Sequence, residues 1–224
     1  MKKKNNNSKK KLIIFAICVA VLAVVAVAFS QTGGMKPFIK PKVCLDAGHG
    51  GSDVGAKYDG RYEKDDNLRL TLAVGKILEE NGITVIYTRQ EDVFVELEDR
   101  ANFANRNHAT HFISIHRNSA ESKVSGVEIW VESMAPEYDK NFAKYIADSI
   151  DEVGYGDKRG VKQGYQGNPL ANYLVNSVTE MPSCLIEMGF ITTPEDNELF
   201  DKNFDAYAKA IADGIIEGIK KAKD

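Results

Sequence analysis

Short apolar runs of two kinds alternate along residues 43–219, and this alternation restricts the possible folds more than any other feature of the sequence. Runs rich in β-branched residues are typical of buried strands, whereas apolar residues that recur every three or four positions are typical of helices. Alternating strands and helices predict an α/β fold, with a mainly parallel, twisted sheet that carries helices on both faces. The expected strands are 43–45, 83–88, 112–115, 127–131 and 183–186, and the expected helices are 65–80, 96–107, 136–153 and 204–219.

A continuous run of 18 apolar residues, 12–29, precedes this region and follows six lysines within residues 1–11. A helix of this length rises about 27 Å, close to the roughly 30 Å hydrocarbon core of a bilayer. The lysines predict that residues 1–11 form a cytoplasmic segment and that the chain beyond residue 30 is exported. Two interpretations remain: residues 12–29 are an uncleaved membrane anchor, or they are a signal peptide that is removed near Ser30.

The exported part of the chain is acidic and poor in cysteine. Residues 31–224 carry 23 Lys and Arg against 32 Asp and Glu, which disfavours a nucleic-acid partner because phosphate backbones are bound mainly by basic side chains. Three cysteines are too few for a disulfide framework, and we expect Cys44 and Cys184 to pack as small apolar residues. Residues 30–42 hold two glycines and two prolines and are expected to be a spacer, which leaves residues 43–224 as one domain.

Three of the predicted strands end in a side chain that can bind a metal ion or move a proton. His49 follows the first strand in a glycine-rich segment, His116 ends the third, and Glu187 ends the last. Ligands of α/β sheets collect beyond the carboxyl ends of the strands, so we expect these three side chains to converge. Glycines at 48, 50 and 51 leave room for a close approach of the backbone around His49.

Each of these residues also has an ordinary structural explanation. A histidine at a strand end is more often a hydrogen-bonding surface group than a metal ligand, and His108 and His111, with polar neighbours, are expected at the surface. Glu63 lies in a charged segment, where a carboxylate is normally solvated or belongs to the first turn of a helix. Glu187 differs because a lone carboxylate in an apolar strand is costly to bury unless it is paired, metal-bound or acting as an acid or base.

Six ordered segments make the sequence similar to a known enzyme family. They are Leu-Asp-Ala-Gly-His-Gly-Gly at 45–51, Tyr-Glu-Lys-Asp-Asp-Asn-Leu at 62–68, Thr88-Arg89 with Arg100 and Ala104-Asn105, Ile-Ser-Ile-His-Arg-Asn at 113–118, Arg-Gly-Val-Lys at 159–162, and Leu-Ile-Glu-Met-Gly-Phe at 185–190. In this pattern the chain resembles the zinc-dependent N-acetylmuramoyl-L-alanine amidases. Those enzymes cut the amide bond between the lactyl group of muramic acid and the L-alanine of the peptidoglycan stem peptide. The resemblance covers residues 43–219, so it implies that residues 43–224 are a catalytic domain and that peptidoglycan is the partner.

The resemblance also implies the roles of the site residues. His49, Glu63 and His116 would hold one catalytic Zn²⁺, and Glu187 would be the catalytic acid and base. Two histidines and a carboxylate leave a fourth position for water, as hydrolytic zinc sites require. Asp46 is expected either to orient His49 or the local loop, or to make an ordinary structural hydrogen bond.

Candidates for substrate binding are Asn118, Arg117 and Arg159. Arg117 stands where the family usually has a small residue, and it either contacts substrate carboxylates or points to solvent. Residues 154–167, which include Tyr155 and Tyr165, form either a rim that grips glycan or peptide or an ordinary surface loop. Residues 119–151 leave no space for the long insert that covers the zinc in some members, so we expect no self-blocking segment.

Three other functions stay open on the sequence alone. A wall-binding protein could keep the fold without catalysis, although the four expected site residues are present, and a zinc peptidase could cut within the stem peptide. Cysteine hydrolase chemistry at Cys44 has the least support because no independent base is assigned to it.

Overall fold

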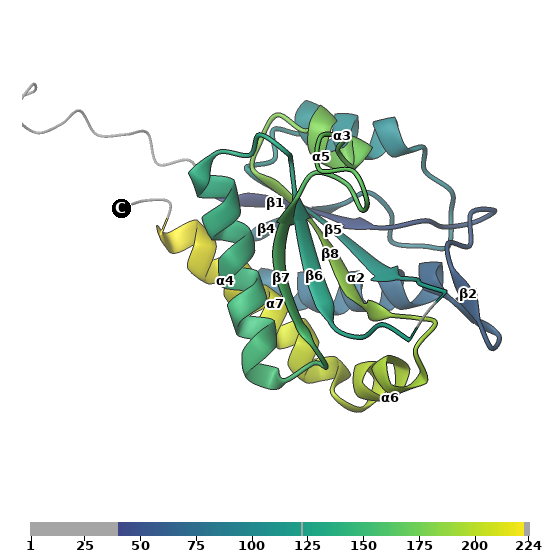
Figure 1. Cartoon of the computed structure of the whole chain (residues 1–224). Helices are drawn as coiled ribbons and strands as arrows, with labels where there is room; N and C mark the ends of the chain where they lie inside the picture. Colours follow the sequence, from purple (N-terminus) through teal and green to yellow (C-terminus); the bar gives the residue numbers. More distant parts are fainter. Residues whose placement is uncertain (1–39, 122, 222–224) are drawn as a thin grey trace, which may run out of the picture. The chain divides into compact units, whose positions relative to one another are not determined.

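The computed structural model describes residues 40–121 and 123–221, and their centre is a six-stranded sheet (Figure 1). The strand order is β4-β1-β5-β8-β6-β7. Four of the neighbouring pairs are parallel, and only β6 and β8 are antiparallel, which confirms the predicted mainly parallel sheet. The bounds are Lys42–Ala47 for β1, Thr84–Tyr87 for β4, His111–Asn118 for β5, Val127–Val131 for β6, Lys158–Gln163 for β7 and Ser183–Phe190 for β8. A separate hairpin pairs β2 (Lys57–Tyr58) with β3 (Arg61–Tyr62).

Helices cover both faces of the sheet, as the alternating pattern predicts (Figure 1). On one face α2 (Glu63–Glu80), α4 (Glu137–Val153) and α7 (Phe204–Lys221) enclose the larger hydrophobic core, and on the other α3 (Leu97–Arg106) and α5 (Leu174–Val178) enclose a smaller one. Helix α6 (Pro194–Lys202) contacts both β8 and α7. Helices α4 and α7 pack closely because a Cβ at Gly214 would lie only 2.5 Å from Cα of Ile146.

Strand β8 shows how the two faces receive different residues. Cys184, Ile186 and Met188 belong to the larger core, whereas Leu185 belongs to the smaller one. Successive side chains of a strand point to opposite faces, so Glu187 shares the face of Leu185. This alternation brings the carboxyl of Glu187 to the side of the sheet that α3 and α5 only partly cover.

The sequence pattern does not predict β7, α5, α6 or the short hairpin. Strand β7 lies at the edge of the sheet, is exposed or half-buried along its length, and contains Gly160 in place of an apolar alternation. Residues 154–167 are therefore partly an edge strand, not a loop throughout. Helix α2 also begins two residues earlier than expected, at Glu63.

The predicted membrane segment, residues 12–29, lies outside the described residues, as does the spacer up to residue 39. Among residues 40–121 and 123–221, no helix combines the length and the apolar character that a membrane span requires.

Candidate metal centre and active-site cavity

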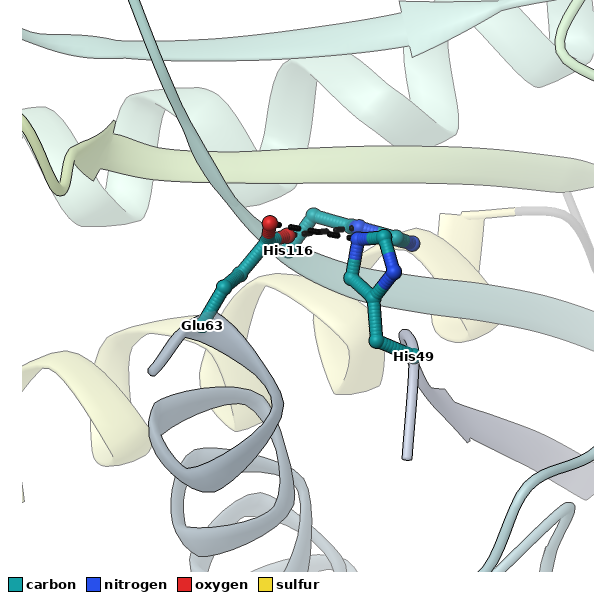
Figure 2. A group of neighbouring side chains, drawn as sticks. All are labelled: His49, Glu63 and His116. Atoms are coloured by element: carbon teal, nitrogen blue, oxygen red, sulfur yellow. Dashed lines mark hydrogen bonds and ion pairs between the residues drawn. The ribbon is translucent and has the colours of Figure 1, made fainter. Parts of the chain in front are cut away.

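His49, Glu63 and His116 come together from three separate elements (Figure 2). His49 follows β1, Glu63 is the first residue of α2, and His116 lies in β5. Nε2 of His49 is 3.1 Å from Oε2 of Glu63, and Nδ1 of His116 is 2.9 Å from Oε1 of the same carboxylate. One ligand atom from each side chain lies within 4.8 Å of the others, so the three groups that the resemblance implies as zinc ligands form one cluster.

Electrostatic interactions within the cluster favour an ionised carboxylate. Burial alone would raise the pKa of Glu63, but the hydrogen bonds and charges of His116 and His49 outweigh burial and hold that pKa well below its usual range. Burial would likewise lower the pKa of His49, but Glu63 and Asp53 outweigh it and raise that pKa. Metal binding needs a deprotonated carboxylate and neutral imidazoles, so the low pKa of Glu63 favours it, whereas a bound ion would have to displace the proton that the raised pKa of His49 favours.

Two glycines provide the space that the cluster occupies. A Cβ at Gly48 would lie 2.2 Å from Cε1 of His116, and a Cβ at Gly55 would lie 2.6 Å from Oε2 of Glu63. His49 itself has a φ of 60°, which is uncommon for a residue other than glycine. Strained backbone of this kind persists only where the surrounding structure holds it in place.

Two buried arginines hold the strained segment by its carbonyl oxygens. Arg100 donates to the carbonyl oxygens of Ala47 at 2.7 Å and of His49 at 2.8 Å. Arg89 donates to the carbonyl oxygens of Ala47 at 2.8 Å and of Gly48 at 2.9 Å. Arg89 and Arg100, which belong to the third of the six sequence segments, therefore support the backbone of the His49 segment.

Asp46 has a structural role and does not orient His49. Its carboxylate pairs with Arg100 at 2.8 Å and accepts hydrogen bonds from Thr88 and Ser114, both at 2.6 Å. Burial alone would raise the pKa of Asp46, but the Arg100 charge and the two hydroxyl donors lower it. Asp46 therefore makes structural hydrogen bonds and, through Arg100, helps to hold the loop that carries His49, without contacting the His49 ring itself.

Asp53 lies beside the metal-ligand candidates and has no counterpart among the residues expected from the sequence. Its Oδ2 lies 2.8 Å from Nδ1 of His49, and its Oδ1 accepts the N–H of Gly55 at 3.1 Å. A backbone bridge between Gly50 and Asp53 closes the turn. The only sequence signal is an aspartate two residues before a glycine, which is typical of a turn.

Glu187 is buried close to the cluster. It is 7% exposed, pairs in register with His116 of β5, and lines the same cavity as the three ligand candidates. Its Oε2 is buried and has no hydrogen-bond partner within the described residues. Burial, with the nearby charges of Glu63 and Glu128, raises the pKa of Glu187 well above its usual value, and Arg117 opposes that rise.

The cavity has a volume of about 580 Å³, which is within the size range of small-molecule sites. The metal ligand candidates, Glu187 and Asn118 line one part of it, and Leu97 contributes an apolar contact. Residues from the β7–α5 connection and from α5 form another part, namely Tyr165, Gln166, Asn172, Tyr173, Leu174 and Val175, and Ala56, Arg117, Ser119 and Leu185 complete the lining.

The three substrate-binding candidates have different surroundings. Asn118 lines the cavity and donates to Oε1 of Glu128 at 2.7 Å, while Arg159 donates to Oε2 of the same carboxylate at 3.0 Å. The Arg117 guanidinium is buried between Asp66 and Asn197, at 2.7 Å from each. Arg117 therefore does not point to solvent, and its two terminal nitrogens are engaged within the protein. The residue also lines the cavity, so its contact with substrate carboxylates stays a prediction.

Two further expectations need correction. His111 is buried, not at the surface, because Tyr138 and Phe142 of α4 cover it, and this burial lowers the pKa of His111 to about 4. His108 is exposed, as predicted. Tyr155 is buried and donates to the carbonyl oxygen of Asp196 at 2.8 Å, so it cannot grip a substrate, whereas Tyr165 does line the cavity.

The two cysteines of the described residues are buried and free, as expected. Burial, and next the charge of Asp46, raise the pKa of the Cys44 thiol far above its usual value. A cysteine nucleophile acts as the thiolate, so this environment argues against cysteine hydrolase chemistry.

Comparisons with known proteins agree with this geometry. Residues 43–221 match the Amidase_3 family, described as N-acetylmuramoyl-L-alanine amidase. The sporulation-specific N-acetylmuramoyl-L-alanine amidase of Bacillus subtilis (strain 168) is 33% identical over 186 residues, which are 81% of this chain and 68% of that protein.

Two solved structures share both fold and sequence with the chain. The amidase AmiC2 of Nostoc punctiforme superposes with a TM-score of 0.72 at 33% identity, over 81% of this chain and 98% of that one. The catalytic domain of the amidase CwlV from Bacillus (Paenibacillus) polymyxa var. colistinus gives 0.71 at 34% identity, over 80% and 98%.

Proposed function

Because the chain belongs to the Amidase_3 family of N-acetylmuramoyl-L-alanine amidases, we propose that it is a zinc hydrolase that cleaves the bond between N-acetylmuramic acid and L-alanine in peptidoglycan. The observation that carries the proposal is the meeting of His49, Glu63, His116 and Glu187 at one cavity. Three metal donors with a separate carboxyl beside them form the set of groups that metal-assisted amide hydrolysis needs.

The donor set fits zinc in its chemistry and its spacing. Two imidazoles and a carboxylate are a common protein contribution to catalytic zinc sites, whose fourth position stays open. Each imidazole nitrogen lies within 3.1 Å of an oxygen of Glu63, and one ligand atom from each of the three residues lies within 4.8 Å of the others, so the donors are close enough to share one ion.

Proton transfer is the task that we assign to Glu187. When bound, zinc polarises the amide carbonyl and lowers the pKa of water to about 7. Glu187 takes the proton of the attacking water and gives it to the alanine nitrogen, because an amine leaves poorly unless it is protonated. Burial and the nearby charges of Glu63 and Glu128 raise the pKa of Glu187, so once the carboxylate has taken the proton from water it holds that proton until the alanine nitrogen accepts it.

We place the stem peptide at the end of the cavity near Asn118. Arg159 lies next to this end, since the same Glu128 carboxylate accepts hydrogen bonds from both residues. A guanidinium has five N–H donors, and the bond to Glu128 uses one of Arg159's. Arg159 thus brings positive charge close to the position at which a carboxylate-bearing peptide would leave the cavity.

The proposed substrate requires the catalytic domain to act outside the cytoplasm. Residues 12–29 serve this function either as a membrane anchor, which we favour, or as a signal peptide cleaved near Ser30. Membrane fractionation of the intact protein tests the anchor, and a mature N-terminus near Gln31 would show cleavage instead.

Digestion of purified cell-wall sacculi tests the proposed activity. The zinc-loaded protein should release new N-terminal L-alanine and leave intact glycan strands, and chelation should stop the release until zinc is restored. Binding to sacculi without release would indicate a non-catalytic wall-binding protein. Cleavage between amino acids of the stem peptide would indicate a zinc peptidase, and activity that survives complete metal removal would contradict the zinc mechanism.

A further inference from the structure

Two groups of residues within the cavity lining differ in charge. The first group contains the ionisable side chains His49, Glu63, His116, Arg117 and Glu187. The second, which we call the β7–α5 lining, consists of Tyr165, Gln166, Asn172, Tyr173, Leu174 and Val175. The β7–α5 lining contains no acidic or basic residue, so it carries no charge at physiological pH. Burial raises the pKa of its Tyr173 further above the usual value. A charged ligand group would find no opposite charge in this lining.

Aromatic residues connect the β7–α5 lining to the core of the protein. Trp130, on β6, is 7% exposed, and its ring centroid lies 5.8 Å from that of Tyr173. The Tyr173 ring in turn lies 4.7 Å from the Tyr165 ring, which is 46% exposed at the cavity. Tyr165 is thus the outermost of three aromatic rings that contact one another in turn, the first of which, Trp130, belongs to the smaller hydrophobic core.

The backbone around Tyr165 is also fixed. Tyr165 and Asn168 exchange two backbone hydrogen bonds, at 3.2 Å and 2.9 Å, and the side chain of Asn172 accepts the N–H of Ser133 at 2.7 Å. An aromatic surface that is held in place before binding loses little conformational entropy when a ligand covers it. A ring that stays partly exposed inside the cavity contributes less to the hydrophobic core than a buried one, and its free surface is available to a ligand.

We propose that Tyr165 is a stacking platform for a pyranose ring of the glycan strand. The inference rests on the amidase function proposed above and adds the direction in which the substrate lies. A pyranose of an N-acetylated sugar has an apolar C–H face and a rim of hydroxyl and amide groups. The Tyr165 ring matches that face, and the side-chain amides of Gln166 and Asn172 supply both donors and acceptors for the rim.

The charge distribution assigns the sugar, and not the stem peptide, to this lining. Once the lactyl carboxyl of muramic acid is in amide linkage, the sugar carries no charge, whereas the peptide ends in a carboxylate. Moving an unpaired carboxylate against a neutral wall is unfavourable. The cations lie at the other end of the cavity: Arg117 belongs to the lining next to Asn118, and Arg159 lies beside Asn118 through Glu128. The glycan therefore extends along the β7–α5 lining and the peptide leaves toward Asn118.

Binding measurements on a protein that does not turn over test the inference. The full-length, zinc-loaded Glu187→Gln protein is titrated calorimetrically with glycan strands that are freed of stem peptides and whose lactyl carboxyls are capped as amides, and separately with free stem peptide. Adding Tyr165→Ala should weaken glycan binding roughly tenfold, the expected scale for one aromatic contact, and leave peptide binding unchanged. Adding Tyr165→Phe, which keeps the ring, should restore most of the glycan affinity.

Tyr58 provides the matched control. It is 37% exposed but does not line the cavity, so Tyr58→Ala should change neither affinity. Thermal unfolding of each variant shows whether a loss of binding reflects a loss of fold. The inference is overturned if glycan affinity is the same with and without the Tyr165 ring. It is also overturned if Tyr165→Ala weakens peptide binding instead, or if the Glu187→Gln protein shows no measurable glycan binding. None of these results depends on turnover, so they are distinct from failure of the amidase proposal, which product analysis detects.

Discussion

Nδ1 of His49 lies 2.8 Å from a carboxylate oxygen of Asp53, while Nε2 of the same ring lies 3.1 Å from Glu63. The two ring nitrogens therefore have different tasks. A carboxylate at Nδ1 keeps the proton on that nitrogen, so that Nε2 keeps its lone pair for a metal ion. The Asp53 side chain is 44% exposed, so it contributes little to the core, and its contact with His49 is the role that we infer for it.

The first prediction concerns this pair. Asp53→Ala should weaken zinc binding about 10- to 100-fold, because His49 loses the group that fixes its tautomer and orientation. Competition with a chelating dye measures zinc affinity directly and needs no catalytic activity. Asp65→Asn, which removes an exposed carboxylate from the first turn of α2, is the control and should bind zinc normally. Unchanged zinc affinity in Asp53→Ala would show that the contact is only structural.

The second prediction separates metal binding from proton transfer. His49→Ala and His116→Ala should each lose most of the bound zinc, because each removes one of three donors. Glu187→Gln should keep the zinc and lower turnover on sacculi by about 10²- to 10⁴-fold, the usual contribution of a general acid or base. Metal analysis of each purified variant is compared with its release of alanine N-termini. Loss of zinc from Glu187→Gln, or its normal turnover, would contradict the assigned role.

The third prediction concerns the buried pair Asp46–Arg100, in which both side chains are at most 2% exposed. Arg100→Ala should lower the free energy of unfolding by about 3–5 kcal/mol, because a buried carboxylate loses its partner. The carbonyl oxygens of Ala47 and His49 lose their donor as well. Urea unfolding measures the change.

The surface pair Lys144–Asp148 is the control for this measurement. Its side chains are 64% and 55% exposed, so Lys144→Ala should cost at most about 1 kcal/mol. If the two variants lose similar stability, Asp46 and Arg100 do not hold the His49 segment in the way that their contacts indicate.

The sequence predicts the convergence of His49, His116 and Glu187 because each follows or ends a strand, and neighbouring parallel strands present their carboxyl ends at one edge. Strand β5 lies between β1 and β8 and is parallel to both, so the carboxyl ends of the three strands lie side by side. Glu63 has no such signal. It is the first residue of α2, so its position also fits an ordinary acid at a helix N-terminus, and only the resemblance to a family identified it as a ligand.

Residues that depend on distant contacts could not be predicted in this way. Asp53 reaches His49 through a turn closed by its bridge to Gly50, and a turn has no periodicity to reveal it. His111 has polar sequence neighbours, but Tyr138, 27 positions later, helps to bury it. Arg117 is buried by Asp66 and by Asn197, 51 and 80 positions away. Local polarity reports on neither kind of contact.

The last prediction concerns the pH dependence of stability. Burial lowers the pKa of His111 to about 4 in the folded protein, against about 6.5 for an unfolded histidine. Between these values the unfolded chain binds a proton that the folded protein does not, so the free energy of unfolding decreases as the pH is lowered from about 6.5 to about 4, by up to about 1.4 kcal/mol per pH unit. Urea unfolding at several pH values should show a shallower decrease for His111→Gln. The exposed His108→Gln should follow the unsubstituted protein, and a His111→Gln curve parallel to both would contradict the burial argument.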